Sequence, residues 1–235
     1  MYKRAIILAG GKGTRLRPYT VVLPKPLMPV SEYPILEIIV RQLSKNHFDQ
    51  ITIAVNHQAD IIKAYFGDGS KWNIDINYSL ETIPLSTMGP LKLIKDLPEN
   101  FLIMNGDILT DLNFSELFDY HLKRKNLFTI SSCKRRHKAD FGVLEINKKN
   151  ELISFKEKPV VEYSVSMGVY CANKEIVNII PENVEYGFDD LMVKLIELKK
   201  PAVVKHYEGY WLDIGRRDDY MKAIDEFENI RNRVI

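Results

Sequence analysis

The sequence LAGGKGTRLRPYTVVLPKPLMPV spans residues 8–30 and overlaps the end of a short apolar run at residues 5–9. An unbroken apolar run of this length is typical of a strand that is buried on both faces of a parallel sheet. The glycines that follow it let the backbone approach an anion and leave amide hydrogens free to donate to it. Arg15 adds a planar fork of donors, and Lys25 adds a compact charge between two prolines. The stretch therefore predicts a strand that ends in a loop suited to a triphosphate.

Apolar runs of strand length alternate with helical patterns along the chain. Strands are expected at residues 5–9, 51–55, 74–80, 101–104, 128–132, 143–146 and 165–171. Helices are expected from about Pro34 and at residues 61–66, 91–95, 188–198 and 220–230. This order predicts the α/β class, with a three-layer, Rossmann-like, mixed but mainly parallel sheet and helices on both faces. In such sheets ligands bind at the carboxyl ends of the strands.

The composition fits one globular domain over residues 1–235. The chain is 46% hydrophobic and 27% charged, and its formal net charge is only +2, which argues against a general nucleic-acid binder. No apolar stretch approaches the ~18 residues of a membrane helix. Cys133 and Cys171 stand far apart, so they suggest neither a disulfide framework nor a zinc site and suit a reducing cytoplasm.

Two common phosphate-loop motifs do not fit the glycine-rich stretch. Leu16 stands where a dinucleotide fingerprint would have its third glycine, and Gly13 follows Lys12 where a Walker A loop needs Ser or Thr. The five histidines show neither a Ser-His-Asp order nor His-x-x-x-His spacing, which disfavours hydrolytic triads and zinc chemistry. The basic run at residues 134–138 is expected to be a solvated loop rather than a phosphate or partner contact.

The whole stretch, Gly10-Gly11-x-Gly13-Thr14-Arg15-Leu16-x-Pro18 followed by Pro24-Lys25-Pro26-Leu27-x-Pro29-Val30, resembles the signature of the sugar-1-phosphate nucleotidylyltransferases. The chain looks most similar to mannose-1-phosphate guanylyltransferase-like enzymes of that family. The resemblance implies a nucleotide-diphospho-sugar transferase fold whose loop wraps the nucleotide phosphates. It implies that Arg15 neutralises the departing pyrophosphate and that Lys25 lies beside the reacting phosphates. The nucleotide-binding residues expected in this stretch are Leu8, Ala9, Gly10, Gly11, Gly13 and Thr14.

Two acidic motifs are the candidate metal site. Asp107 follows the strand expected at residues 101–104, and Asp213 lies near the C-terminal end in Trp-Leu-Asp-Ile-Gly. Taken singly, the first could be only a turn and the second only a helix cap. Magnesium prefers oxygen ligands and usually takes one or two carboxylates from a protein. The resemblance implies that Asp107 and Asp213 are the Mg²⁺ ligands.

Further motifs resemble those that line the substrate pockets of this family. The residues that the resemblance implies for the sugar phosphate are Asn105, Gly142, Glu157, Lys158, Ser166 and Gly168. From composition alone, Glu157 and Lys158 would instead be a solvated turn before Pro159. Many relatives have Asn where Ser166 stands. The residues expected at the base are Glu81, Thr87 and Gly89; Glu81 is either an acceptor for a guanine edge or an exposed end-of-strand charge. This chain departs from relatives by Ser86 in place of a glycine and Met88 in place of an alanine.

The expected activity is transfer of a nucleoside monophosphate from a triphosphate, with GTP favoured, to a sugar 1-phosphate. The products are a nucleotide sugar and pyrophosphate. Two alternatives remain: a cytidylyltransferase of the same fold acting on a phosphate such as phosphocholine, and a non-catalytic nucleotide-sugar-binding subunit. The expected partners are the two substrates, with no nucleic acid and no membrane, and homo-oligomerisation stays open. A C-terminal β-helix, which larger relatives carry, is not expected.

Overall fold

A seven-stranded sheet forms the centre of the computed structural model, which describes residues 2–11, 13–56 and 58–235. Its strands, in spatial order, are β12 (Val203–His206), β8 (Phe128–Lys138), β11 (Val160–Asn173), β6 (Asn100–Asn105), β1 (Arg4–Leu8), β4 (Gln50–Val55) and β5 (Asp75–Leu80). Neighbouring strands run parallel except at β11, which is antiparallel to both β6 and β8. The mixed, mainly parallel sheet predicted from the alternation of elements is confirmed.

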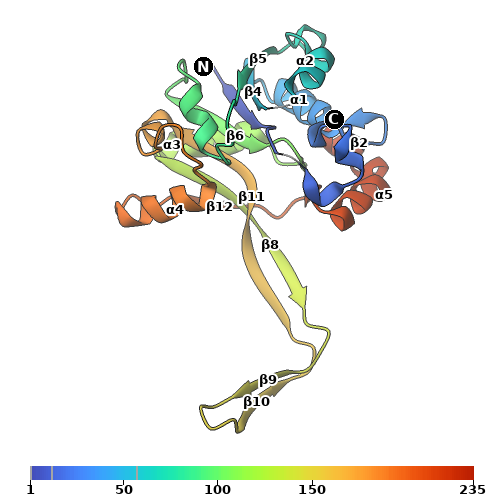
Figure 1. Cartoon of the computed structure of the whole chain (residues 1–235), viewed down its shortest axis with the longest axis vertical. Coiled ribbons are helices and arrows are strands. Elements are labelled where there is room, and N and C mark those ends of the chain that lie inside the picture. The colour runs from blue at the N-terminus through green and yellow to red at the C-terminus, as the bar shows by residue number, and fades with distance from the viewer. Residues whose placement is uncertain (1, 12, 57) are drawn as a thin grey trace.

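Helices cover both faces of this sheet because consecutive residues of its central strands are apolar, and consecutive side chains point to opposite faces (Figure 1). Ala5 and Ile7 of β1 belong to the core on one face, whereas Ile6 belongs to the core on the other. The first face is packed by α1 (Ile35–Lys45), α2 (Ala59–Phe66), α3 (Phe114–Arg124) and α5 (Arg217–Val234), and the second by α4 (Phe188–Glu197). No helix among the described residues is long and apolar enough to cross a membrane.

A small two-stranded sheet lies beside the carboxyl ends of the central strands. Its strands are β7 (Ile108–Thr110) and β13 (Trp211–Asp213), which pair antiparallel. The Ile214 amide also donates to the Asp107 carbonyl, at 3.1 Å. Two segments that are distant in the sequence are therefore held side by side. A further short pair, β2 (Pro29–Val30) and β3 (Tyr33–Pro34), precedes α1.

A long two-stranded ribbon, here called the arm (residues 134–166), leaves the sheet (Figure 1). β8 and β11 stay paired out to Lys138 and Val160, and β9 (Val143–Ile146) and β10 (Leu152–Lys156) form the tip. The register of the β8–β11 pair shifts near Gly168, whose φ is +73°. No residue of the arm is buried.

Several elements differ from what the sequence pattern predicts, including strands β10 and β12, which were not expected. The helix expected at residues 91–95 is only a 3₁₀ turn, Gly89–Leu93, because Pro90 opens it and Ile94 is already extended. The basic run at 134–138 is part of strand β8, where it pairs with β11, rather than a loop. Helix α3 was not predicted, although Asn113 caps it by accepting from the Glu116 amide at 3.0 Å.

Candidate active site

The loop after β1 lines a cavity of about 890 Å³ at the carboxyl end of the sheet. Its walls are Leu8, Ala9, Gly10, Gly11, Arg15, Lys25, Pro26, Asn56, residues 81–87, Asn105, Gly106, Asp107 and Glu185. A Cβ atom on Gly10 would stand 2.6 Å from a Glu81 carboxylate oxygen, and the Asn56 side-chain amide donates to the Gly10 carbonyl. A larger residue at this position would have to displace the Glu81 carboxylate from the wall of the cavity. We call this space the nucleotide cavity.

Three residues expected at the nucleotide support the cavity rather than line it. Gly13 has a φ of +62° and opens the 3₁₀ turn Thr14–Leu16, and its carbonyl accepts from the Thr20 hydroxyl at 2.7 Å. The amide of Gly89 donates to the Tyr186 carbonyl at 3.0 Å, just after the cavity-lining residues 81–87 in the sequence. These contacts fix the shape of the loops because they leave their backbones few alternatives.

The expected base-contacting residues Glu81 and Thr87 both line the nucleotide cavity. Burial raises the pKa of the Glu81 carboxyl, so this group ionises less readily than an exposed glutamate. The Thr87 hydroxyl accepts from the Phe188 amide at 2.8 Å, which ties this wall to the first turn of α4. The wall is thus anchored to the body of the protein.

Lys25 lies at the innermost end of the cavity, where its ammonium contacts the Asp107 carboxylate. Burial lowers the pKa of Lys25 to about 8, with Asp213 acting to raise it and Arg15 acting to lower it further. The side chain is only 12% exposed. A cation held this deeply interacts strongly with a neighbouring phosphate because little water screens the charge.

Asp107 and Asp213 converge on one point beside Gly215. A Cβ atom on Gly215 would stand 2.3 Å from Lys25 Nζ, 2.8 Å from Asp213 Oδ1 and 3.0 Å from Asp107 Oδ2. Pairing of β7 with β13 produces this arrangement, and the Gly215 amide donates to Asp213 Oδ1 at 2.9 Å. Across residues 2–11, 13–56 and 58–235, no group of three or more His, Cys, Asp or Glu side chains is disposed to hold a metal. Two neighbouring carboxylates nevertheless fit magnesium, which takes its remaining ligands from water and substrate phosphates.

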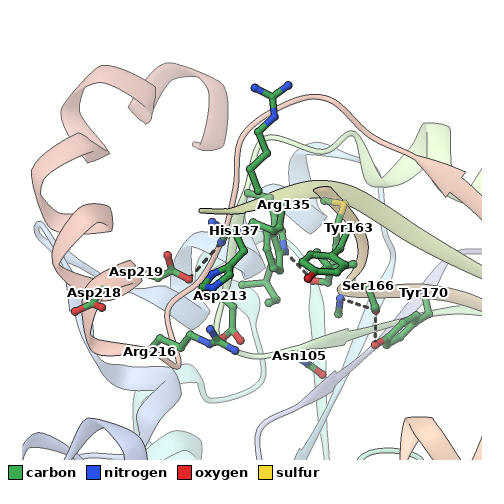
Figure 2. A pocket seen from close by; sticks show the side chains of 16 residues that line it. Asn105, Arg135, His137, Tyr163, Ser166, Tyr170, Asp213, Arg216, Asp218 and Asp219 are labelled. Carbon is green, nitrogen blue, oxygen red and sulfur yellow. Dashed lines mark hydrogen bonds and ion pairs between the residues drawn. The ribbon is translucent and has the colours of Figure 1, made fainter. Parts of the chain in front are cut away.

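A second cavity, of about 570 Å³, adjoins the first, and we call it the acceptor cavity (Figure 2). Asn105 lines both cavities, while Asp107 lines one and Asp213 the other. The expected residues Ser166 and Gly168 lie here too. Ser166 Oγ is 3.0 Å from the Tyr170 hydroxyl, and the Tyr170 ring stacks on Phe188 at 4.7 Å.

Gly168 has a structural reason to be glycine. Its φ is +73°, and a Cβ atom there would stand 2.7 Å from the Asn105 side-chain nitrogen. The left-handed backbone and the close amide both exclude a larger residue. Asn105 is thereby placed at the junction of the two cavities.

Three arginines line the acceptor cavity, Arg135, Arg136 and Arg216, and the sequence pattern assigned none of them to it. The Arg135 guanidinium lies 4.7 Å over the Trp211 ring and 3.3 Å from an Asp219 oxygen. Arg216 lines the cavity but, among the described residues, forms no ion pair (Figure 2). Its place directly after Gly215 was a signal that could have identified it, because it follows the expected metal motif in the sequence.

Three residues expected at the sugar phosphate line neither cavity. Gly142, Glu157 and Lys158 are exposed on the arm, where a Cβ atom on Gly142 would stand 2.6 Å from the Phe155 ring and 3.1 Å from a Glu157 oxygen. They lie together at the tip because β8 and β11 remain paired and carry the chain away from the body (Figure 1). The structure thus separates this group from Asn105, Ser166 and Gly168.

Comparison with known proteins gives a consistent family. The UTP–glucose-1-phosphate uridylyltransferase of Synechocystis sp. (strain PCC 6803) is 32% identical over 241 residues, which cover 94% of this chain and 62% of that protein. The D-glycero-alpha-D-manno-heptose 1-phosphate guanylyltransferase of Aneurinibacillus thermoaerophilus is 34% identical over 228 residues, covering 96% of this chain and 98% of that protein. The chain therefore spans less than two thirds of the first relative and nearly all of the second.

Solved structures agree with these relatives. The crystal structure of HddC from Yersinia pseudotuberculosis superposes with a TM-score of 0.75 at 26% identity, covering 97% of this chain and 100% of that one. A structure of the same protein complexed with GMP-PN gives a TM-score of 0.72. Residues 4–230 match the family model described as nucleotidyl transferase. The chain therefore belongs to the nucleotidyl transferase family.

Proposed function

We propose that this chain transfers a nucleoside monophosphate from a nucleoside triphosphate to a sugar 1-phosphate and releases pyrophosphate. The observation that supports this proposal is the meeting of two cavities at Asn105, with Lys25, Asp107 and Asp213 at the junction. Each cavity has room for one substrate. A reaction between two phosphates needs such a junction, where charged groups hold both reactants in line.

The triphosphate lies along the loop after β1, with Arg15 and Lys25 facing its phosphates. The sugar 1-phosphate lies in the acceptor cavity, and one of its phosphate oxygens attacks the α-phosphorus. The bond from that phosphorus to the bridging oxygen breaks, and pyrophosphate departs with its electron pair. The attacking oxygen is already ionised, so no side chain has to remove a proton from it. Lys25 and Arg15 offset the repulsion between the two anions and the charge on the leaving group.

Asp107 and Asp213 would hold a magnesium ion at the point beside Gly215. Such an ion supplies charge neutralisation and a template for phosphate oxygens. The contact between Lys25 and Asp107 keeps this carboxylate close to the junction. Arg216, which has no ion-pair partner among the described residues, is the cation that we assign to the acceptor phosphate. Its guanidinium can make two parallel hydrogen bonds to a phosphate.

The proposed triphosphate is GTP. Glu81 lines the nucleotide cavity, and an ionised carboxylate only accepts hydrogen bonds, so it suits a base edge that presents several donors. The heptose guanylyltransferase and the complex with GMP-PN support this choice, whereas the uridylyltransferase opposes it. Replacement of Glu81 by Ala should lower the preference for GTP over UTP more than it lowers turnover with UTP.

The decisive experiment is a matrix of the four triphosphates against several sugar 1-phosphates, read by pyrophosphate release. Release with at least one sugar 1-phosphate, and more of it with GTP than with the other triphosphates, is the expected result. Release of no pyrophosphate with any pair, together with tight binding of a nucleotide sugar, would establish a non-catalytic binding protein instead.

One observation favours including phosphocholine in the panel. Aromatic residues line the acceptor cavity, among them Tyr163, Tyr170 and Trp211, and aromatic faces bind quaternary ammonium groups. However, Arg135 already covers the Trp211 ring and Phe188 stacks on Tyr170. One face of each of these two rings is thus already covered, which supports the sugar phosphate over phosphocholine.

A further inference from the structure

The pairing of β7 with β13 brings Asp107 and Asp213 together, yet each of these strands has only three residues. The pairing runs from Asp213 opposite Ile108 to Trp211 opposite Thr110. A short two-stranded ribbon is marginally stable by itself in water. A shift of the pairing by one residue would move Asp213 by about 3.4 Å along the strand and turn its side chain to the opposite face. The register of this pair therefore decides whether the two carboxylates meet.

Asp111 follows β7 directly and has three partners at the end of the strand pair that lies away from Asp107. Asp111 Oδ1 accepts hydrogen bonds from the Tyr210 amide, at 2.7 Å, and from the Tyr207 hydroxyl. Asp111 Oδ2 contacts the guanidinium of Arg233, in the last turn of α5. The Asp111 side chain is only 9% exposed. A buried carboxylate needs its partners in place, because an unpaired buried charge is costly.

The segment that leads from β12 into β13 packs closely around Asp111. A Cβ atom on Gly209, between the two tyrosines that donate to Asp111, would stand 2.6 Å from Asp111 Oδ1. The Asp111 amide donates to the Tyr210 carbonyl at 3.3 Å, and the Thr110 hydroxyl donates to the same carbonyl at 2.7 Å. Both the backbone and the side chain of Asp111 are thus bonded to Tyr210. A shifted register would break these bonds together.

Other contacts hold β13 to the body of the protein. Leu212 and Ile214 belong to the core, and their alternation fixes which face of the strand points inward. The Trp211 indole donates to the Met167 carbonyl at 2.8 Å, on the side of the acceptor cavity. These contacts orient β13 towards the core and β11, whereas the bonds of Asp111 join it to β7.

We propose that Asp111 is a positioning residue: it fixes the register of β7 against β13 and so holds Asp213 where it can share one magnesium ion with Asp107. The inference rests on the proposed function, which assigns these two carboxylates to the metal. Asp111 lines neither cavity, so it acts on the site through the two strands. Its part is that of a hydrogen-bond acceptor, because Tyr207 and Tyr210 both donate to Oδ1.

Metal binding tests this role without relying on turnover. Mn²⁺ is titrated into the whole chain, and electron paramagnetic resonance measures the free ion. Asp111→Ala should weaken Mn²⁺ binding about tenfold or more, as is usual when the support of a metal ligand is removed. Asp111→Asn keeps an oxygen at the Oδ1 position and should restore most of the affinity. Asp213→Asn should abolish the signal of this site and so distinguishes it from any other Mn²⁺ site.

Two variants show whether the bonds to Oδ1 are responsible. Tyr207→Phe removes one donor and keeps the ring, so it should weaken Mn²⁺ binding less than Asp111→Ala does. Glu226→Ala is the matched control, because Glu226 Oε2 accepts from the Tyr210 hydroxyl at 3.0 Å and has no part in the pairing of β7 with β13. This control should bind Mn²⁺ like the wild type. Thermal unfolding checks that each variant is folded at the temperature of the titration, since lower stability alone does not change the affinity of the folded protein.

The outcomes separate the positioning role from the proposed function. Wild-type Mn²⁺ affinity in Asp111→Ala, with pyrophosphate release intact, would overturn the positioning role and leave the proposed function standing. Weakened Mn²⁺ binding in Asp111→Ala, in a chain whose wild type releases no pyrophosphate, would do the reverse. A wild-type chain that does not bind Mn²⁺ would also overturn the positioning role. If Asp111→Ala does not fold, undiminished affinity in Tyr207→Phe would overturn it.

Discussion

The loop after β1 and the tip of the arm both carry several charged residues, yet the structure holds them in different ways. Around the loop, Leu16 and Thr20 are buried, and Asn56 and Glu81 contact Gly10. At the tip, no residue is buried, and the contacts are confined to the ribbon itself. Charged loops thus acquire a fixed position from the packed residues beneath them, not from their own composition.

The largest expected effect comes from the junction of the two cavities, where Lys25, Asp107 and Asp213 lie together. Asp107→Asn and Asp213→Asn should each reduce turnover by about 10²–10³-fold or more, because each removes a carboxylate that would hold the magnesium ion against the reacting phosphates. Pyrophosphate release measures the effect, and thermal unfolding checks that each variant is folded. Wild-type release by either variant would contradict the assignment of these residues to a metal.

Removal of the arm tip should affect the sugar 1-phosphate and not the triphosphate. Ala139 and Pro159 are adjacent, since the Ala139 amide donates to the Pro159 carbonyl at 3.0 Å, so an Asn-Gly turn can replace residues 140–158. The resemblance to the family implies that Glu157 and Lys158 contact the sugar 1-phosphate, and on that premise loss of their hydrogen bonds should lower kcat/KM for this substrate about 100-fold. Binding of the triphosphate, measured by calorimetry, should be unchanged. A parallel loss of both would mean that the tip supports the nucleotide cavity as well.

Substitution of Arg216 tests whether the body of the protein binds the acceptor phosphate without the arm tip. Arg216→Ala should raise KM for the sugar 1-phosphate about tenfold and leave KM for the triphosphate unchanged, because one charged hydrogen-bonding group is lost. Arg216→Lys should recover part of the effect. The neighbouring Arg217→Ala is the matched control, since Arg217 is exposed and does not line the cavity. Equal KM values for the two alanine variants would refute the role of Arg216.

The smallest expected effect is on the pH dependence of stability and comes from a histidine buried in the body of the protein. His121 on α3 is fully buried between Thr129 and Asn100, and burial lowers its pKa to about 4. The folded protein therefore binds this proton less readily than the unfolded chain, and stability is lost as the pH falls from about 6.5 towards 4. Between pH 7.5 and 6 the loss should be about 1 kcal/mol. Urea unfolding measures it, and His121→Gln should show a shallower dependence on pH.

Local patterns were sufficient for much of the fold and for the nucleotide cavity. The unbroken apolar run predicted the buried strand β1, and the helical spacing of apolar residues predicted α1. Both patterns are local, because residues on the same face of a helix or strand recur at a fixed spacing in the sequence. The loop that carries Arg15 and Lys25 was identifiable because it follows a strand whose carboxyl end lies at the ligand-binding edge of the sheet, whereas Glu81 was assigned through the resemblance to the family. Helix α3 could have been predicted too, from Asn113 followed by Glu116 three residues later.

The acceptor side depends on information that is not local. Strands β8 and β11 continue beyond the body as a ribbon because, in the part of the chain that the structure describes, no other element packs on them there. The residue pattern of a strand does not reveal this, since it looks the same with or without such packing. Arg135 faces the cavity because β8 lies between β11 and β12, and the order of strands in a sheet is not written in the strand itself. The position of Lys158 could not be predicted for the same reason.

The hydrogen bond from the Phe188 amide to Thr87 has a practical consequence for engineering. Phe188 stacks on Tyr170, and Tyr170 lies within hydrogen-bond distance of Ser166. A designer who alters base selectivity through Thr87 will also disturb the wall that receives the other substrate. Mutant libraries that aim at new nucleotide–sugar combinations should therefore vary Thr87 and Ser166 at the same time rather than one after the other.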